Sequence, residues 1–182
     1  MNDNFTIDDL QNTWQKVSIL HNGQTYGGQS KNQKIEYINH IGSVVFEIMN
    51  AAKNTSVFNF DLAVKCAFLH DTIEDTDFSI ENLEKEYGKE VKEGVLALTK
   101  NTNLEKKHQM IDSLERIKAQ PKEVWAVKMA DRICNLYAPY YWNESKKEKY
   151  LEEAKIILEY LREGNDYLAK RLSEKIEAYK TK

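Results

Sequence analysis

The chain has 182 residues, of which 41% are hydrophobic and 30% are charged, and its formal net charge at pH 7 is -3. This length allows one sizeable hydrophobic core and is short for two, so we expect a single domain over residues 1–182 with a core at roughly 6–172. The negative net charge excludes a general basic surface for nucleic acid. No apolar run approaches the length of a membrane span and the first residues lack an export signal, so we expect a cytoplasmic protein that binds neither membrane nor nucleic acid.

The composition favours helices over a turn-rich sheet. Only 7 glycines and 2 prolines are present, whereas the good helix formers Leu, Glu, Lys and Ala are abundant. The two cysteines, Cys66 and Cys134, lie far apart among apolar residues and form no CxxC pair. We therefore expect an all-α fold with buried thiols in a reducing compartment.

The first two predicted helices flank the longest loop signal in the chain. Helix one begins at Thr6, whose hydroxyl can cap its first turn, and continues to His21. Residues 22–30 contain three glycines and are predicted to form a loop that can contact a ligand at the mouth of a pocket. Asn39 is predicted to cap the second helix, with His40 at its beginning.

A third helix is predicted over residues 61–75, and its end carries unusual charge. In one continuous helix His70 and Glu74 lie one turn apart, and so do Asp71 and Asp75. An imidazole and three carboxylates then gather at one end of the helix. Because so many acids repel one another, this cluster predicts a bound cation.

The rest of the chain reads as further helices over residues 80–87, 89–100, 108–118, 123–137, 146–163 and 166–179. The segment 123–137 is apolar on most sides and is therefore expected to be central. Lys128, Asp131 and Asn135 make a polar stripe on it. The aromatic residues 140–142 that follow are expected to pack between helices.

Metal-capable side chains recur on separate predicted helices. They are His40, the adjacent pair His70-Asp71, and Asp131. Taken alone, His40 can be a helix-start residue bonded to backbone, and Asp131 can pair with Lys128 or Arg132 on its own helix. Together, two imidazoles and two carboxylates suit a divalent ion such as Mn, Fe or Zn, and a helical bundle can aim them at one point.

Two further histidines are not assigned to the metal. His21 ends the first predicted helix, where it can be a cap or a structural partner of the pocket. His108 lies at a charged helix start and is expected to be solvated.

Several segments, taken together, resemble a known family. They are His21-Asn22-Gly23-Gln24, Tyr37-Ile38-Asn39-His40, residues 67–76 (AFLHDTIEDT), Leu98-Thr99-Lys100 and residues 127–136 (VKMADRICNL). In this order they resemble the HD-domain metal-dependent phosphohydrolases, and within them the hydrolase domain of the RelA/SpoT homologues and the stand-alone small alarmone hydrolases. The resemblance covers residues 14–172.

The resemblance implies a single-domain HD-type helical bundle with a central Mn site, for which Fe, Zn or Mg are alternatives. The implied ligands are His40, His70, Asp71 and Asp131. Glu74 and Asp75 match the pair that activates or positions water for removal of the 3′-pyrophosphate from guanosine tetra- or pentaphosphate. The implied contacts to phosphate, ribose or base are Lys100, Lys128, Arg132, Asn135 and Tyr150.

Two departures from the family pattern concern the substrate. The loop after the first helix lacks the usual Arg or Lys, with Lys31 and Lys34 only later, and Ile41 replaces a frequent proline. Another nucleotide, such as a nucleoside monophosphate or NADPH, therefore stays an alternative substrate. A nucleotide sensor without hydrolysis is a second alternative, although Glu74 and Asp75 argue against it. The sequence also leaves a homo-oligomer open.

Overall fold

The computed structural model of the protein describes residues 6–28, 30–137 and 142–180. Its helices and strands, in chain order, are α1 (Ile7–Leu20), β1 (Thr25–Gly27), β2 (Lys34–Glu36), α2 (Ile38–Lys53), α3 (Phe60–Leu69), α4 (Thr72–Asp75), α5 (Ile80–Tyr87), α6 (Lys89–Leu98), α7 (Lys106–Lys118), α8 (Lys122–Asn135), α9 (Glu144–Leu161), the short 3-10 helix η1 (Arg162–Gly164) and α10 (Asp166–Lys180). The expected all-α fold is confirmed. The predictions for residues 139–141 lie outside the described residues.

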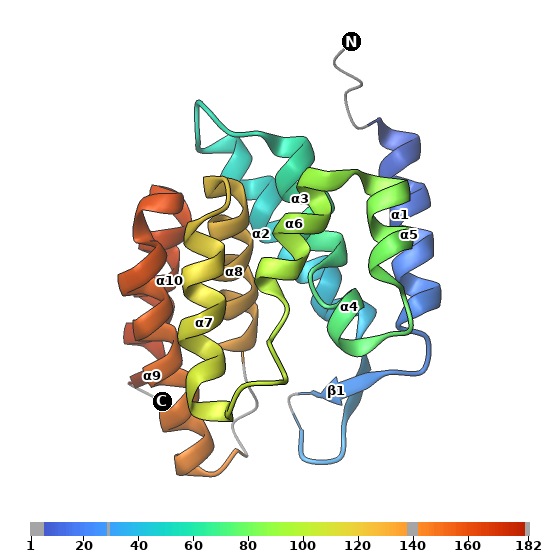
Figure 1. Ribbon diagram of the computed structural model, residues 1–182. Coiled ribbons are helices and arrows are strands. Elements are labelled where there is room, and N and C mark those ends of the chain that lie inside the picture. Colours follow the sequence, from blue (N-terminus) through green and yellow to red (C-terminus); the bar gives the residue numbers. More distant parts are fainter. Residues whose placement is uncertain (1–5, 29, 138–141, 181–182) are drawn as a thin grey trace.

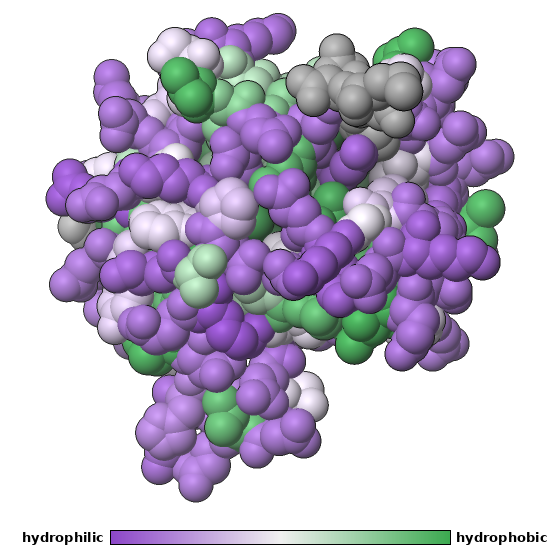
Figure 2. All heavy atoms as spheres, turned by 45° about the horizontal axis from the view of Figure 1, so that its top comes forward, coloured by the Kyte–Doolittle hydropathy of each residue, from purple (hydrophilic) through white to green (hydrophobic). Residues whose placement is uncertain are grey.

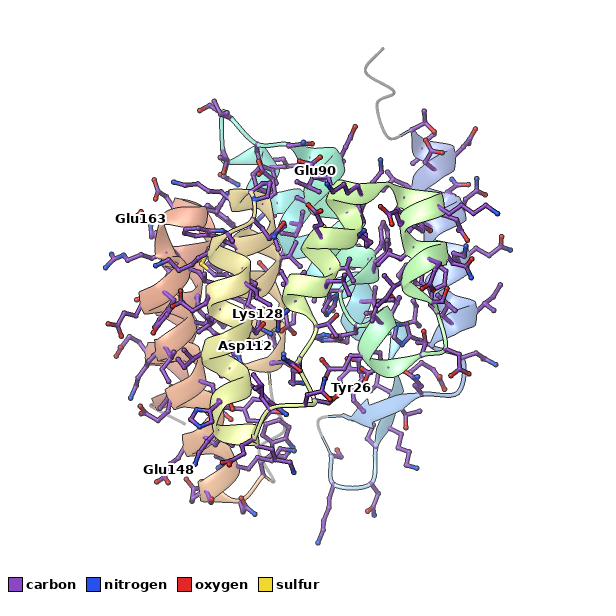
Figure 3. The ribbon with its side chains drawn as sticks, viewed as in Figure 1. Tyr26, Glu90, Asp112, Lys128, Glu148 and Glu163 are labelled. Carbon is purple, nitrogen blue, oxygen red and sulfur yellow. The ribbon has the colours of Figure 1, made fainter. Side chains whose placement is uncertain are left out.

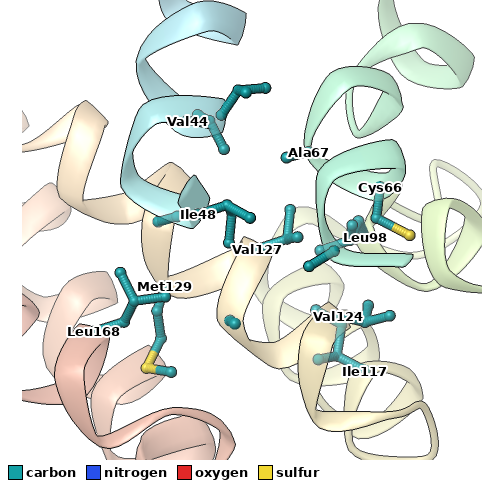
Figure 4. Close-up of a cluster of buried hydrophobic side chains, with 14 of the residues drawn as sticks. Val44, Ile48, Cys66, Ala67, Leu98, Ile117, Val124, Val127, Met129 and Leu168 are labelled. Atoms are coloured by element: carbon teal, nitrogen blue, oxygen red, sulfur yellow. The ribbon is translucent and has the colours of Figure 1, made fainter. Parts of the chain in front are cut away.

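The core is built around α2 and α8. Helix α2 packs against α3 and α8, and α8 also contacts α9 and α10. Figure 1 shows α7 to α10 on one side of the molecule, α1 and α5 on the other, α2, α3 and α6 between them, and the short hairpin at the end where α4 lies. Val44, Ile48 and Val127 meet between these helices with no or almost no exposed surface (Figure 4). The central position expected for the helix containing Asp131 is thus observed.

Where residues 22–30 were expected to form only a loop, part of that segment is a strand. β1 pairs antiparallel with β2, and Tyr26 lies opposite Ile35. The strands are three residues long, too short for an alternating hydrophobic pattern to be recognised in the sequence. The pairing fixes Tyr26 beside α2, where its hydroxyl donates to Asn39 Oδ1 at 2.8 Å.

Two helix starts show where capping rules succeed and fail. At α1 the Thr6 hydroxyl accepts from the Asp9 amide at 3.2 Å, and the Asp9 carboxylate accepts from the Thr6 amide at 2.9 Å. The predicted start of this helix is therefore correct. The predicted cap at Asn39 is wrong, because α2 already begins at Ile38 with Tyr37 as the preceding residue. The Asn39 side chain instead accepts a hydrogen bond from the Tyr26 hydroxyl.

The predicted single helix over residues 61–75 is also wrong. Helix α3 ends at Leu69 and the one-turn helix α4 begins at Thr72. The Thr72 hydroxyl donates to the Leu69 carbonyl at 2.7 Å, and Asp71 has φ -105° and ψ -3°. Such side-chain bonds to backbone compete with helix continuation. His70 and Asp71 therefore lie at a break between helices rather than along one.

The surface is mostly polar on the face shown in Figure 2, with scattered hydrophobic patches. In the described part of the chain, no helix combines the length and the apolar character needed to cross a membrane. Both cysteines are free; Cys66 is buried, whereas Cys134 is only partly buried, which corrects the expectation for that residue. Burial raises the pKa of the Cys66 thiol to about 12, so this thiol is a core residue.

Replacing Ile48 by Ala tests the core between α2 and α8. Ile48 has no exposed surface, and we expect Ile48→Ala to lower the free energy of unfolding by about 2–5 kcal/mol. The neighbouring Met49 is 40% exposed, so Met49→Ala should cost less than about 1 kcal/mol. Urea unfolding followed by circular dichroism measures both, and equal losses would contradict this packing.

Candidate metal centre

The predicted ligand residues converge at one point from three parts of the chain. His40 comes from α2, the pair His70-Asp71 from the break between α3 and α4, and Asp131 from α8. His40 Nε2 is 3.4 Å from Asp131 Oδ1 and 3.8 Å from Asp71 Oδ2. One ligand atom each from His40, His70 and Asp131 lie within 4.8 Å of one another. Residues separated by up to 91 positions in sequence, from 40 to 131, thus form one cluster.

The His70 ring is oriented as a metal-binding imidazole requires. Its Nδ1 is 2.8 Å from the Ala67 carbonyl oxygen; because a carbonyl only accepts, Nδ1 carries a proton and Nε2 is the ring nitrogen that faces the cluster. Nε2 is buried and has no hydrogen-bond partner among the described groups, although Asp71 Oδ2 lies 2.9 Å away. Since buried polar atoms are rarely left unpaired, the donor set fits a divalent cation.

The electrostatics of the cluster favour positive charge at its centre. Although burial opposes ionisation, the pKa of Asp71 is held below its usual range, chiefly by His70. The pKa of Asp131 is likewise low despite burial, because Lys128 and the two imidazoles face it. Burial also opposes charge on His70, yet Asp71 and Asp131 raise its pKa to about 9. Both carboxylates therefore stay ionised and attract a cation.

Two side chains outside the ligand set hold these carboxylates. The Tyr37 hydroxyl donates to Asp71 Oδ2 at 2.5 Å, and the Asn135 amide donates to Asp131 Oδ1 at 2.6 Å. The role of Tyr37 was missed by sequence reasoning, whose only signal was its place in the segment Tyr37–His40. Such partners fix the orientation of a ligand and raise its affinity for metal.

The two acids of α4 differ in their surroundings. Glu74 accepts from the backbone amide of Lys100 at 3.2 Å and pairs with its ammonium group. Asp75 has no ion-pair partner among the described side chains. Partial burial, followed by the charges of Asp71 and Glu74, raises the pKa of Asp75. Asp75 is therefore the acid of α4 that stays free of an ion pair with a described residue and has a raised pKa.

Two cavities meet at the cluster. One of about 340 Å³ is lined by ligands, acids and cations, including Glu74, Lys100 and Lys128. The other, of about 1000 Å³, has aromatic walls that include Tyr26 and Trp142. Tyr37, His40, Asn135 and Tyr150 line both cavities. A ligand can therefore place a highly charged group beside the cluster and a ring system in the larger space.

The predicted substrate contacts all line the smaller cavity: Lys100, Lys128, Arg132, Asn135 and Tyr150. Figure 3 labels Lys128 on α8 and Tyr26 on the hairpin. The Lys128 ammonium is 3.2 Å from Asp131 Oδ2. This is the ion pair within one helix that was expected from the sequence as an alternative for Asp131. Arg132 is 5% exposed, donates to Glu153 at 2.9 Å, and lies 5.2 Å below the Tyr150 ring. The structure thus brings these residues to the cavity, and their contact with substrate stays a prediction.

The remaining histidines are placed as expected. His21 is buried, and its ring packs against Tyr37 with the ring centroids 5.2 Å apart. His108 is exposed on α7. Neither belongs to the cluster formed by the described residues.

No family model matches the chain, but related proteins and structures do. The enzyme named guanosine-3′,5′-bis(diphosphate) 3′-pyrophosphohydrolase MESH1 from Drosophila melanogaster is 29% identical over 147 residues, which cover 78% of this chain and 80% of that protein. The enzyme of that name from Xenopus tropicalis is 30% identical over 146 residues, covering 77% and 79%.

Solved structures show the same arrangement of helices. The structure of a metazoan ortholog of SpoT, described as hydrolysing ppGpp and playing a role in starvation responses, matches with a TM-score of 0.77 at 26% identity over 92% of this chain and 93% of that one. A protein from Listeria monocytogenes shares the fold, with a TM-score of 0.62 at 15% identity over 84% of this chain and 99% of that one.

A helical bundle that brings His, His-Asp and Asp together from separate helices defines an HD-type hydrolase. Given relatives of this identity and coverage, the chain belongs to the RelA/SpoT-type HD hydrolases, in the group that contains the MESH1 proteins. The resemblance seen in the sequence is thereby confirmed.

Removing the Tyr37 hydroxyl tests the support of the metal centre. We expect Tyr37→Phe to weaken Mn²⁺ binding by roughly tenfold or more, because Asp71 loses the donor that orients it. Isothermal titration calorimetry measures the affinity. Tyr167→Phe on α10 is the matched control, since that hydroxyl accepts from Asn50 and touches no ligand. Equal affinities of both variants would show that Asp71 needs no such support.

Proposed function

We propose that the protein is a metal-dependent guanosine-3′,5′-bis(diphosphate) 3′-pyrophosphohydrolase. The carrying observation is the convergence of His40, His70, Asp71 and Asp131 beside the two acids of α4, at the junction of a polar cavity and an aromatic one. The activity for which the related MESH1 enzymes are named supports the same reaction. The reaction releases pyrophosphate from O3′ and leaves guanosine 5′-diphosphate.

We propose Mn²⁺ as the ion and the two imidazoles and two carboxylates as its ligands, with Fe, Zn or Mg as alternatives that the donor types also permit. When bound, such an ion lowers the pKa of a coordinated water and polarises a phosphoryl oxygen. The chain itself supplies ligands already held in place: Ala67 orients His70, Tyr37 orients Asp71, and Asn135 orients Asp131.

Asp75 is the proposed general base. Its raised pKa makes it a stronger proton acceptor than an ordinary carboxylate, and it bears no ion pair with a described residue. It takes a proton from water as the water oxygen bonds to the phosphorus attached to O3′. The bond between that phosphorus and O3′ then breaks, pyrophosphate leaves, and O3′ takes up a proton.

Glu74 and Lys100 have a supporting role in this proposal. Their ion pair joins α4 to the end of α6 and holds the Lys100 ammonium at the smaller cavity. Although burial opposes charge on Lys100, Glu74 raises the pKa of its ammonium group, so it stays charged. We assign Lys100, Lys128 and Asn135, which line the smaller cavity, to the departing pyrophosphate. Tyr150 and the aromatic walls are assigned to ribose and base.

A substrate panel tests the function. Purified protein with Mn²⁺ should release pyrophosphate from guanosine-3′,5′-bis(diphosphate) at least tenfold faster than phosphate from a nucleoside monophosphate or NADPH. Faster turnover of the nucleoside monophosphate or of NADPH would overturn the substrate assignment, although the protein would still be a hydrolase. Tight nucleotide binding without any product would instead identify a sensor. Replacing Mn²⁺ by Fe²⁺, Zn²⁺ or Mg²⁺ in the same assay ranks the metals.

Loss of the base should separate turnover from metal binding. We expect Asp75→Asn to lower kcat by about 10²–10⁴-fold, the usual contribution of a general base, with Mn²⁺ retained. Asp77→Asn is the matched control, because Asp77 is an exposed acid in the same segment and lines neither cavity among the described residues. A small effect of Asp75→Asn beside a large effect of Glu74→Gln would assign the base to Glu74.

Loss of a ligand should remove metal and activity together. We expect His70→Ala to abolish measurable Mn²⁺ binding in calorimetry and to reduce hydrolysis to background, because the neighbouring carboxylates lose a donor that aims at their common centre. Metal content of the purified protein, measured by plasma mass spectrometry, gives a second readout. Retention of stoichiometric metal in this variant would exclude His70 from the ligand set.

A further inference from the structure

The turn from His21 to Gln24 has no role in the proposed reaction. Neither residue is among the described residues that line the two cavities. Yet His21 is only 1% exposed and its Nε2 is buried without a partner among the described groups. Because buried polar atoms are rarely left unpaired in folded proteins, the position of this ring calls for an explanation.

The segment that requires stabilisation by other parts of the chain is the one-turn helix α4. It has four residues, and one helical turn is unstable by itself because few backbone bonds fix many dihedral angles. Within it, the Asp75 amide donates to the Asp71 carbonyl at 2.9 Å and the Thr76 amide to the Thr72 carbonyl at 3.1 Å. The Asp75 carbonyl lies at the end of this turn, where carbonyls have no partner inside the helix.

Gln24 supplies that missing partner. Its Nε2 donates to the Asp75 carbonyl at 2.6 Å, across 51 positions of sequence. Its Oε1 lies 2.7 Å from His21 Nδ1, and because an amide oxygen only accepts, Nδ1 is the donor. A chain of bonds therefore runs from the buried His21 ring through the Gln24 amide to the backbone of Asp75, the proposed general base.

The backbone of the same residue reaches the other side of the centre. Gly23 has φ +78°, a conformation that suits glycine, and the turn it makes lets the Gln24 amide donate to the His21 carbonyl at 3.1 Å. The Gln24 carbonyl accepts from the Tyr37 amide at 2.9 Å, and the Tyr37 hydroxyl holds Asp71. Gln24 is thus bonded to the segment of Asp75 and to the residue that holds Asp71.

We propose that Gln24 is a positioning residue, which fixes the acid-bearing turn α4 relative to the metal ligands through the Asp75 carbonyl. His21 supports it by fixing the orientation of its amide. Gln24 contacts neither metal nor substrate in this proposal, which rests on the function proposed above. Since small displacements of a catalytic group cost large factors in rate, its loss should appear in kcat.

Two variants isolate the bond to Asp75. Gln24→Met keeps the length of the side chain and removes both bonds, whereas Gln24→Glu can still accept from His21 but cannot donate to the Asp75 carbonyl. We expect both to lower kcat by about 10- to 100-fold while KM, Mn²⁺ affinity and the melting temperature stay within twofold or a few degrees of the wild type. Gln11→Met, at an exposed position of α1, is the matched control and should behave as wild type.

Other outcomes of these assays contradict the proposal. An unchanged kcat in Gln24→Glu would show that the donated bond has no part in turnover. A parallel loss of melting temperature, metal affinity and kcat in Gln24→Met would show a role in folding instead.

Hydrogen–deuterium exchange tests the positioning without any substrate. The peptide spanning residues 71–78 should exchange faster in Gln24→Met than in wild type and Gln11→Met, because the turn loses its partner. Unchanged exchange would overturn the proposal whatever the activity. If the wild type releases no pyrophosphate but the exchange rises as expected, the proposed function fails and the positioning of α4 stands.

Discussion

The structure depends on holding two ionised carboxylates and two imidazoles together at the edge of a hydrophobic core. Burying such charges is costly unless each has partners, and here Lys128, Tyr37 and Asn135 supply them. A stable cluster also needs rigid supports. The central helices α2 and α8 each contribute a proposed ligand and pack against each other through residues with no exposed surface, so the position of the proposed metal centre follows from the packing of the core.

The break at His70 and Asp71 decides how the remaining acids are used. In one continuous helix, the four charged side chains would have stacked in two pairs along its surface. Because α3 ends at Leu69 and α4 begins at Thr72, Asp71 instead lies near His40 and beneath the Tyr37 hydroxyl. Glu74 forms an ion pair with Lys100, whereas Asp75 has a raised pKa. The same four-residue turn thus holds two acids in different surroundings, one in an ion pair and one without such a partner among the described residues.

The polar and aromatic cavities differ in part in the elements that line them. Residues of α2, α8 and α9 line both cavities, whereas the acids of α4 and Lys100 line only the polar one and the hairpin residues Tyr26 and Ile35 line only the aromatic one. The loop that departs from the family pattern belongs to the hairpin, which lines the aromatic cavity and contains none of the proposed metal ligands. Lys146 lies 3.6 Å from the centroid of the Trp142 ring there and is the cation among the described residues lining that cavity.

The sequence by itself determined the helical class, most helix positions, and the identity of the metal-capable residues, because hydrophobic periodicity and residue chemistry are local properties. It also predicted correctly that Thr6 begins the first helix. It did not determine the break after Leu69, the start of α2 before Asn39, or the roles of Tyr37 and Gln24. These depend on contacts with distant segments: the Tyr37 hydroxyl meets a residue 34 positions away and the Gln24 amide one 51 positions away. Such partners are fixed only by the packed tertiary structure. Once the core has formed, the long-range contacts outweigh the local conformational preferences of each segment.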